Sequence, residues 1–253
     1  DRDLDGSYDE SAAVHIQLEG ETAVCDSDAV SIDGSRITLL DEGTYLVSGA
    51  LTDGQIVVDA GDTDKVQIVL ASASLTCADS AAIYSKSADK VFLTLAEGTE
   101  NTLTNGGSYT AIDKNNIDSV VFSKTDLTLN GSGSLTIDAQ AGHGVVSKDE
   151  LTITGGSYTV TAAEHGMTGK DSLAVAGGDF TIISGKDGLH AENADDSALG
   201  FLYVADGTFT ITAQGDAVSA SGALQVDGGT FDLTTGEGSA SVTMSTGDSF
   251  GPG

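Results

Sequence analysis

The sequence is poor in the residues that define several common protein classes. Its 253 residues include one proline, two cysteines and no tryptophan. One proline beside 33 glycines excludes a Pro-rich disordered chain. Cys25 and Cys77 cannot build a disulfide framework, so either one bridge or two free thiols is expected. No segment approaches the ~20 apolar residues of a membrane span, so we expect no membrane partner.

Basic residues are also scarce. Ten Lys and Arg stand against 39 Asp and Glu, which gives a formal net charge of −29. Coulomb repulsion at this charge excludes nucleic acid and anionic membranes as natural partners. The charge favours divalent cations, or a solvated extracellular surface. The chain opens with DRDLDGSYDE and no signal peptide, so its localisation has to be inferred from its acidic composition. We expect a secreted or cell-surface protein. We also expect a monomer.

A repeat of about 22 residues runs through most of the chain. Residues 145–166 (VVSKDELTITGGSYTVTAAEHG), 167–188 and 218–239 align, each with three short alternating runs separated by Gly, Asp or Ser. The runs are too short and too strictly alternating for helices. Self-similarity at a fixed period predicts a stacked architecture. We predict an all-β fold: a right-handed parallel β-helix of about eight three-strand rungs.

The predicted register rests on three columns of inward residues, in which like residues stack about 4.8 Å apart. The first column is Val30, Ile56, Ile83, Val121, Val145, Met167, Leu189 and Val218. The second column is Leu39, Ile68, Leu93, Leu129, Ile153, Val175, Val204 and Val226. The third column is Tyr45, Leu75, Leu103, Leu135, Tyr158, Phe180, Phe209 and Phe231.

Breaks in this register predict the domain organisation. Residues 1–29 lack the repeat and are expected to cap the N-terminal end, residues 30–239 to form the β-helix, and residues 240–253 to be a tail or linker. Interruptions at 104–119 and 194–200 are expected to be loops. Extra residues in a solenoid gather on one face, often the binding face.

Several stretches resemble a family of secreted bacterial carbohydrate-binding domains that is best represented in clostridia. The matching stretches are DRDLDGSYDE, DEGTYLVSG, GQIVVDAGDTDKVQIVL, KSADKVFLTLAEGTENTL, HGVVSKDELTITGGSYTV and, most specifically, GKDGLHAEN. The resemblance covers nearly the whole chain. It implies a pectate-lyase-like, right-handed parallel β-helix with bound calcium. It also implies binding, without cleavage, of cellulose or acidic plant polysaccharides such as polygalacturonate.

A column of lysines is the first candidate ligand-binding feature. The outward position three residues after each first-run start holds Lys86, Lys124, Lys148 and Lys170 in consecutive rungs. Such a strip could meet sugar carboxylates, or it could be a surface salt-bridge ladder with neighbouring acids. Tyr84 and Phe122 stand beside it and could stack on a sugar ring, or the 104–119 insertion could cover them. The missing tryptophan excludes the flat indole platform common in binders of crystalline cellulose.

Three acidic clusters are candidate calcium sites, since calcium takes six to eight oxygen ligands. The first pairs Asp187 with Asp216. The second consists of Glu192, Asn193, Asp195 and Asp196 with Asp171, and the third pairs Asp33 with Asp59. The alternative for each is a solvated acidic surface. His143 and His165 also share a turn column, where a structural role is favoured over a transition-metal site.

Enzymatic and non-enzymatic functions remain as alternatives. A lyase of this fold needs a neutral basic side chain near a calcium-bound uronate. The only arginines are Arg2 and Arg36, outside the middle of the repeat, and a lysine base flanked by carboxylates would have a raised pKa. We therefore predict a non-catalytic, calcium-containing carbohydrate-binding module with no catalytic residues. A lysine-dependent polysaccharide lyase and a structural adhesion domain are the alternatives.

Overall fold

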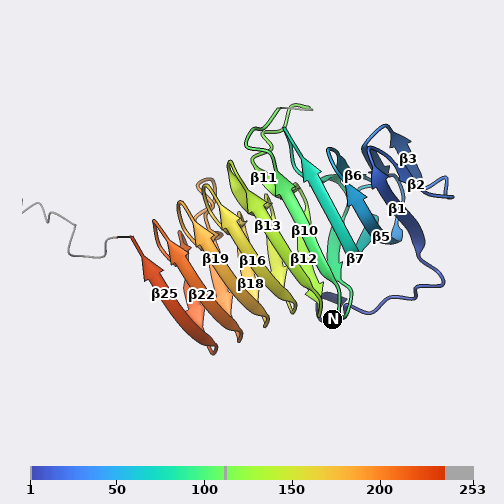
Figure 1. Cartoon of the computed structure of the whole chain (residues 1–253). Helices are drawn as coiled ribbons and strands as arrows, with labels where there is room; N and C mark the ends of the chain where they lie inside the picture. Colours follow the sequence, from blue (N-terminus) through green and yellow to red (C-terminus); the bar gives the residue numbers. More distant parts are fainter. Residues whose placement is uncertain (1, 111–112, 237–253) are drawn as a thin grey trace, which may run out of the picture.

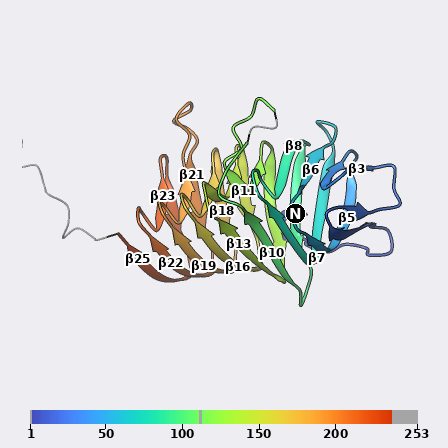
Figure 2. The ribbon, with the colours of Figure 1, turned by 45° about the horizontal axis from the view of Figure 1, so that its top comes forward.

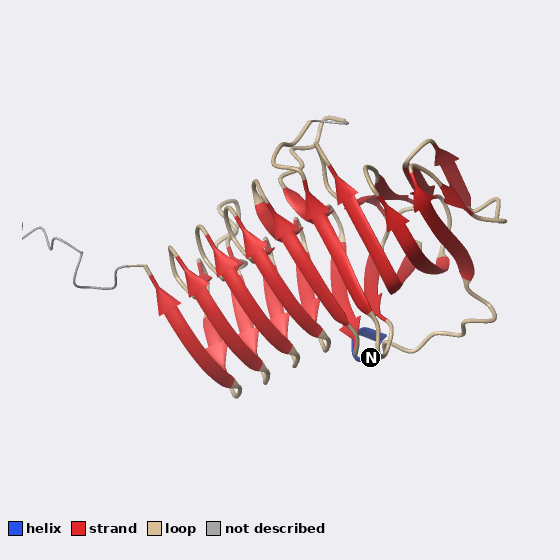
Figure 3. Ribbon diagram, in the orientation of Figure 1, coloured by secondary structure: helices blue, strands red, loops and turns tan. Residues whose placement is uncertain are grey.

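A computed structural model describes residues 2–110 and 113–236 of the chain. These residues form strands almost throughout, apart from one 3₁₀ turn, η1 (Arg2–Leu4), and the connecting loops (Figures 1 and 3). Among these described residues, no helix is long and apolar enough to cross a membrane. The strands are arranged in two sheets, and neighbouring strands are mostly parallel.

The nine-stranded sheet forms the first stack of strands. Apart from a hairpin at its N-terminal end, its successive members come from successive repeat units, and the chain leaves this sheet between them to visit the other one. Its strands are β3 (Val30–Asp33), β4 (Arg36–Leu39), β6 (Gln55–Asp59), β8 (Ile83–Ser87), β11 (Ser119–Ser123), β14 (His143–Ser147), β17 (Met167–Gly169), β20 (Leu189–Ala191) and β23 (Val218–Ala220).

The sixteen-stranded sheet contains a second and a third stack, which β7 (Lys65–Cys77) joins. The first part of β7 pairs with β9 and its last part with β10, and β5 (Gly43–Leu51) pairs along both parts. The second stack continues through β9 (Lys90–Leu95), β12 (Asp126–Gly131), β15 (Glu150–Ile153), β18 (Ser172–Val175), β21 (Phe201–Val204) and β24 (Leu224–Val226). The third continues through β10 (Glu100–Asn105), β13 (Ser134–Ala139), β16 (Ser157–Ala162), β19 (Asp179–Ser184), β22 (Thr208–Ala213) and β25 (Thr230–Thr235).

Most of the predicted register is confirmed. In the first column, Ile56 pairs with Ile83, and the pairing continues through Val121, Val145, Met167, Leu189 and Val218. In the second, Ile68 pairs with Leu93 and the pairing continues through Leu129, Ile153, Val175, Val204 and Val226. A period of two along each strand therefore turns the same side chains inward in unit after unit.

The register prediction was wrong at the N-terminal end. Strand β3 runs antiparallel to β4, so Val30 faces Leu39, and Ile37 takes the place beside Ile56. Tyr45 pairs with Ile68 and so belongs to the second column. Here β1 (Val14–Gly20) adds to β5 in parallel, and β2 (Ala23–Val24) folds back on β1. Antiparallel hairpins thus finish this end of both sheets, because a hairpin closes within a few residues where a parallel neighbour needs a long crossover.

A second difference lies in the third stack. Leu103 pairs with Ile137, whereas Leu135 pairs with Asn101, two residues away from the predicted match. The shift of two keeps both leucines on the inner face. The side-chain amide of Asn101 is buried and donates to the Ser134 carbonyl oxygen, while its oxygen accepts from the Ala73 amide. The sequence period alone could not separate two registers that share the same buried face.

Aromatic rings fill the third stack toward the C-terminal end. Tyr158, Phe180, Phe209 and Phe231 lie in consecutive strands, and the Phe180 and Phe209 rings are 4.8 Å apart at 2°. The spacing matches the distance between hydrogen-bonded strands. A glycine precedes each ring by two positions. Gly178, for example, has φ +124°, and a Cβ there would lie 3.2 Å from the Phe180 ring.

Residues 2–4 run across the outer face of the second stack. Asp3 forms an ion pair with Lys90 at 2.7 Å and accepts from Thr128 Oγ1 at 2.6 Å, and its carbonyl accepts from Thr154 Oγ1. Arg2 lies over the Phe92 ring. Residues 2–4 therefore contact several repeat units that lie far from them in the sequence. The N-terminal ends of the two sheets are formed instead by β1 to β3. The predicted tail, 240–253, lies outside the described residues.

Candidate functional site

A groove of about 390 Å³ lies on the outer face of the first stack, over β14, β17 and β20. The loops from the two predicted interruptions project on the same side of the molecule, green and orange in Figure 2. The groove is lined by His143, Val146, Ser147, Lys148, Glu164, His165, Thr168, Lys170, Lys186, His190, Glu192 and Ala194.

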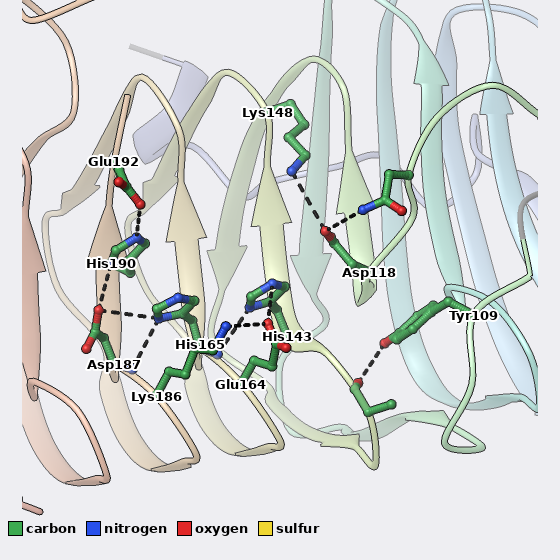
Figure 4. Close-up of polar contacts among 12 residues, drawn as sticks. Tyr109, Asp118, His143, Lys148, Glu164, His165, Lys186, Asp187, His190 and Glu192 are labelled. Carbon is green, nitrogen blue, oxygen red and sulfur yellow. Dashed lines mark hydrogen bonds and ion pairs between the residues drawn. The ribbon is translucent and has the colours of Figure 1, made fainter. Parts of the chain in front are cut away.

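Three histidine rings are stacked in this groove (Figure 4). The centroids of His143 and His165 are 5.1 Å apart, and those of His165 and His190 are 4.1 Å apart, with interplanar angles of 9° and 14°. His143 and His165 occupy the same turn position in successive units. His190 comes from the outward position of β20, three residues after the equivalent turn residue Asp187.

Backbone hydrogen bonds fix the tautomer of two of these rings. The amide of His165 donates to Nδ1 of His143, and the amide of Asp187 donates to Nδ1 of His165, both at 3.1 Å. Nδ1 is then an acceptor, so the neutral ring carries its proton on Nε2. Nε2 of His143 lies 3.2 Å from Glu164 Oε2, which also pairs with Lys186 Nζ at 3.0 Å.

Burial keeps these two rings neutral. It lowers the pKa of His143 from 6.5 to about 4, against the opposing effect of Glu164. Burial lowers the pKa of His165 to about 4 as well, helped by the neighbouring His190 and His143. The Lys186 ammonium lowers the pKa of Glu164. At neutral pH the floor of the groove therefore offers uncharged imidazoles beneath charged lysines and glutamates.

Asp187 joins the histidine stack at its far end. Its Oδ1 accepts from the amide of Asp216 at 2.8 Å, and its Oδ2 lies 2.8 Å from His190 Nδ1 and 3.4 Å from His165 Nδ1. The predicted pair Asp187 and Asp216 is thus brought together through the Asp216 backbone. The Asp187 carboxylate faces imidazole nitrogens, which calcium does not use as ligands.

The lysine column has the predicted register. The amides of Lys124, Lys148 and Lys170 donate to the carbonyls of Ser85, Ser123 and Ser147, one unit earlier in each case. Three of the four predicted lysines have acidic partners. The ion pairs are Lys86 with Asp59, Lys148 with Asp118, and Lys170 with Asp195. Of the four, Lys148 and Lys170 line the groove, and Lys186 joins them from a turn.

The prediction that Tyr84 and Phe122 bind sugar rings was wrong. Both are buried, with 0% and 1% of their surface exposed. Ile117 of the insertion packs against them, and Tyr84 donates from its hydroxyl to Asp113 Oδ2 at 2.7 Å. The insertion thus covers these rings as a second small core, which was the alternative expectation. The outward-facing rings of Tyr84 and Phe122 form a hydrophobic patch on the sheet, and the insertion of the same chain buries this patch.

A ladder of acidic side chains runs beside the lysine column. Burial, together with Asp126 and Asp171, raises the pKa of Asp149 to about 6. Asn193 continues the ladder: its side-chain amide donates to Asp171 Oδ1 at 2.6 Å. Of the predicted second calcium cluster, Asp171 and Asn193 are therefore in contact, and Asp149 is the neighbour that the prediction omitted.

The other members of that cluster have separate partners. The Asn193 side-chain oxygen accepts from the amides of Asp195 and Asp196, Asp195 binds Lys170, and Asp196 accepts from the Ala198 amide. Glu192 Oε2 lies 3.3 Å from His190 Nε2. These contacts shape the loop that closes one end of the groove.

The third predicted cluster is not assembled. Asp33 stands opposite Arg36 in the β3–β4 hairpin, while Asp59 pairs in register with Ser87 and binds Lys86. Each aspartate is the last residue of its strand, and because β3 runs antiparallel to β4 and β6, the two carboxylates lie at opposite edges of the sheet. Cys25 and Cys77 are both free thiols.

Comparison with known proteins identifies the family. Residues 33–252 match the family described as "Carbohydrate-binding domain-containing protein". The chain belongs to this family. A protein of the same description from Acetivibrio thermocellus is 37% identical over 137 residues, which are 53% of this chain and 48% of that protein. The match thus spans about half the length of that relative.

A solved structure shares the fold of this carbohydrate-binding domain. It is described as the polysaccharide lyase-like protein from C. thermocellum, in a gadolinium derivative. It superimposes with a TM-score of 0.79 at 32% identity, covering 89% of this chain and 98% of that one. The carbohydrate-binding family and the lyase-like parallel β architecture, both expected from the resemblance, are confirmed.

Sequence reasoning missed the histidine stack. It placed His143 and His165 in one turn column, and it included none of His190, Lys186 and Glu164 in any site. The available signal was the (i, i+3) spacing of Asp187 and His190 across the start of a strand. That spacing lets a side chain on the strand reach back over the turn column.

Proposed function

We propose that the chain is a secreted, non-catalytic module that binds plant cell-wall polysaccharide, either cellulose or an acidic pectic glycan. The proposal includes closure of the three stacks into a right-handed parallel β-helix with bound calcium, acting as a monomer. Its main support is the groove, where Lys148, Lys170 and Lys186 converge in a chain of net charge −29. Three ammonium groups that converge in one groove suit the carboxylates of a uronate polymer.

The ion pairs of these lysines do not oppose this role. Lys148, Lys170 and Lys186 bind Asp118, Asp195 and Glu164 at 4.0, 2.7 and 3.0 Å. The pairs of Lys170 and Lys186 are exposed on both sides, and such pairs contribute only about 0.2–1 kcal/mol each. A sugar carboxylate can therefore replace one of these partners at small cost, and a polymer can do so at several lysines together.

The Asp149–Asp171 ladder fits the proposed calcium better than the other predicted clusters. The raised pKa of Asp149 shows that its charged form is poorly compensated. A divalent cation beside Asp149 and Asp171 would relieve the repulsion between these two carboxylates, and carboxylate oxygens are the ligands that calcium prefers. When bound, calcium would supply a positive charge beside the lysine column, where a uronate carboxylate could also reach it.

A polysaccharide lyase is the second candidate, favoured by the lyase-like structural relative. The side chains of the groove argue against it. A lysine base must be neutral, but the hydrogen bond to Asp195 raises the pKa of Lys170. Arg2 lies over Phe92 on the second stack, and Arg36 is on β4, so neither arginine lines the groove.

Retention on immobilised polygalacturonate and on cellulose tests the proposal. The variant Lys148→Ala/Lys186→Ala should weaken retention on polygalacturonate about tenfold or more, since two charge-assisted contacts are lost. Lys65→Ala is the matched control, because Lys65 forms a similar exposed ion pair, with Asp89, away from the groove. Calcium removal should weaken retention further.

Other outcomes separate the alternatives. Equal retention of the double variant and the control would remove the groove from the mechanism. Ultraviolet absorbance from an unsaturated uronate product would identify a lyase instead of a binder. If the intact chain is retained by neither polysaccharide, with or without calcium, a structural or adhesive role is favoured.

A further inference from the structure

The end of the histidine stack gathers three donor groups of the kind that hold transition metals. Asp187 Oδ2 lies 2.8 Å from His190 Nδ1 and 3.4 Å from His165 Nδ1, and the donors of all three residues lie within 4.8 Å of one another. Donor atoms around a tetrahedral zinc, at about 2.0–2.2 Å from the metal, are about 3.4 Å apart. The donors are therefore already close to the spacing that such an ion requires.

Hydrogen bonds outside this set hold the donors in place. The Asp216 amide occupies Asp187 Oδ1, which leaves Oδ2 directed at the two rings. His190 Nε2 lies 3.3 Å from Glu192 Oε2 (Figure 4). A carboxylate behind a histidine in this way fixes the ring tautomer and raises the basicity of the opposite nitrogen. That opposite nitrogen is Nδ1, the one facing Asp187.

The contact between His190 and Asp187 is incomplete as it stands. If Glu192 accepts the Nε2 proton, then Nδ1 of the neutral His190 ring and Oδ2 of Asp187 are two acceptors facing each other at 2.8 Å. His190 Nδ1 is also buried without a hydrogen-bond partner. Two lone pairs at that distance repel unless a proton or a metal ion lies between them. This contact is the observation that points to a ligand.

We propose that His165, Asp187 and His190 form a binding site for a divalent transition metal ion of the zinc class. Two imidazole nitrogens and one carboxylate suit zinc, cobalt, nickel or copper, whereas calcium and magnesium prefer oxygen ligands only. The ion replaces the Asp187 amide as partner of the His165 Nδ1 lone pair. Because His165 and His190 line an open groove, water or a sugar oxygen can complete the coordination shell.

The site is independent of the calcium ladder and of the proposed polysaccharide binding. It uses none of Asp149, Asp171 and Asn193, and it can hold an ion whether or not a glycan binds. Its variants also separate it from the predicted calcium pair. Asp216 contributes only its backbone amide, so Asp216→Asn should leave the ion bound, while Asp187→Asn removes a ligand.

The test is titration of the metal-free chain with zinc, and with cobalt as a spectroscopic probe, in excess calcium to occupy other carboxylates. We expect one ion per chain, a raised melting temperature with zinc, and cobalt absorption bands of a nitrogen-containing site. His190→Gln and Asp187→Asn should weaken binding at least about tenfold. Asp216→Asn and His15→Gln, the latter at an exposed histidine on β1, should bind as the wild type does.

Several results would overturn the site. One is a melting temperature that zinc does not change. The others are a cobalt spectrum that His190→Gln leaves unchanged and a loss of binding in His15→Gln. Melting of each variant in chelator checks that it folds. If Asp187→Asn does not fold, His190→Gln decides, since its ring lies at the groove surface. A proton shared by His190 and Asp187, with no metal affinity, is the outcome that would replace the proposal.

Discussion

Acidification should destabilise the chain through His143 and His165. Their pKa values in the folded state are about 4, against 6.5 for the free side chain, because burial disfavours the charged rings. The unfolded chain therefore binds their protons first. The contribution to stability is complete above pH 6.5 and is lost as the pH falls toward 4. At pH 5 the loss is about 2 kcal/mol for each histidine, from a pKa difference worth 1.36 kcal/mol per unit.

The measurement is the free energy of unfolding in urea between pH 7 and pH 4.5, with chelator present. His143→Gln/His165→Gln cannot take up these protons, so its stability should fall less steeply, by up to about 1.4 kcal/mol per pH unit for each proton removed. His15→Gln is the control, because this histidine is exposed on β1. Parallel curves for the wild type and the double variant would refute the reasoning, and so would an equal effect of the control.

Three further changes test other parts of the structure. Phe180→Ala leaves a cavity within the ring stack and should cost about 3–5 kcal/mol in urea unfolding, whereas Ile183→Ala, at a position 54% exposed on the same strand, should cost little; equal losses would contradict the packing. Asp149→Asn should raise the melting temperature at pH 7 without calcium and not at pH 4, because the raised pKa of Asp149 opposes folding as the pH rises toward 6; a lower melting temperature at pH 7 would argue against this. Asp3→Ala removes the contact with Lys90 and should make the N-terminal segment easier to cleave by protease, with little change in melting temperature; unchanged cleavage would show that the segment is held by other contacts.

The sequence was sufficient for the stacked strands and for most of their register. Alternation with a period of two and the 22-residue repeat identify which side chains turn inward, and neighbouring units repeat the same choice. The hairpin of β3 and β4 could not be read in this way. Val30 and Ile37 are equally suited to an inward position, and only the pairing decides which of them lies beside Ile56.

The candidate site was less predictable because it depends on contacts between side chains that belong to different columns or to loops. Lys148 and Lys170 were placed by the repeat, but their acidic partners come from loops that have no register. Tyr84 was expected to face solvent because the repeat assigns it outward, and the insertion that buries it has no periodic signal. His190 reaches the other rings across a strand start, which a column alignment keeps apart.

The pairing of equivalent glycines and rings in successive units sets a rule for how such a chain can change in length. Removing residues 167–188 would bring Tyr158 against Phe209 with every inward position retained, since both come two residues after a left-handed glycine. Removing a single residue from β19 would instead turn the later residues of that strand to the opposite face. Within the strands, the loss of a whole repeat unit therefore keeps the inward positions, whereas the loss of one residue does not. Deleting residues 167–188 would keep His165 but would remove Asp187 from the end of the histidine stack.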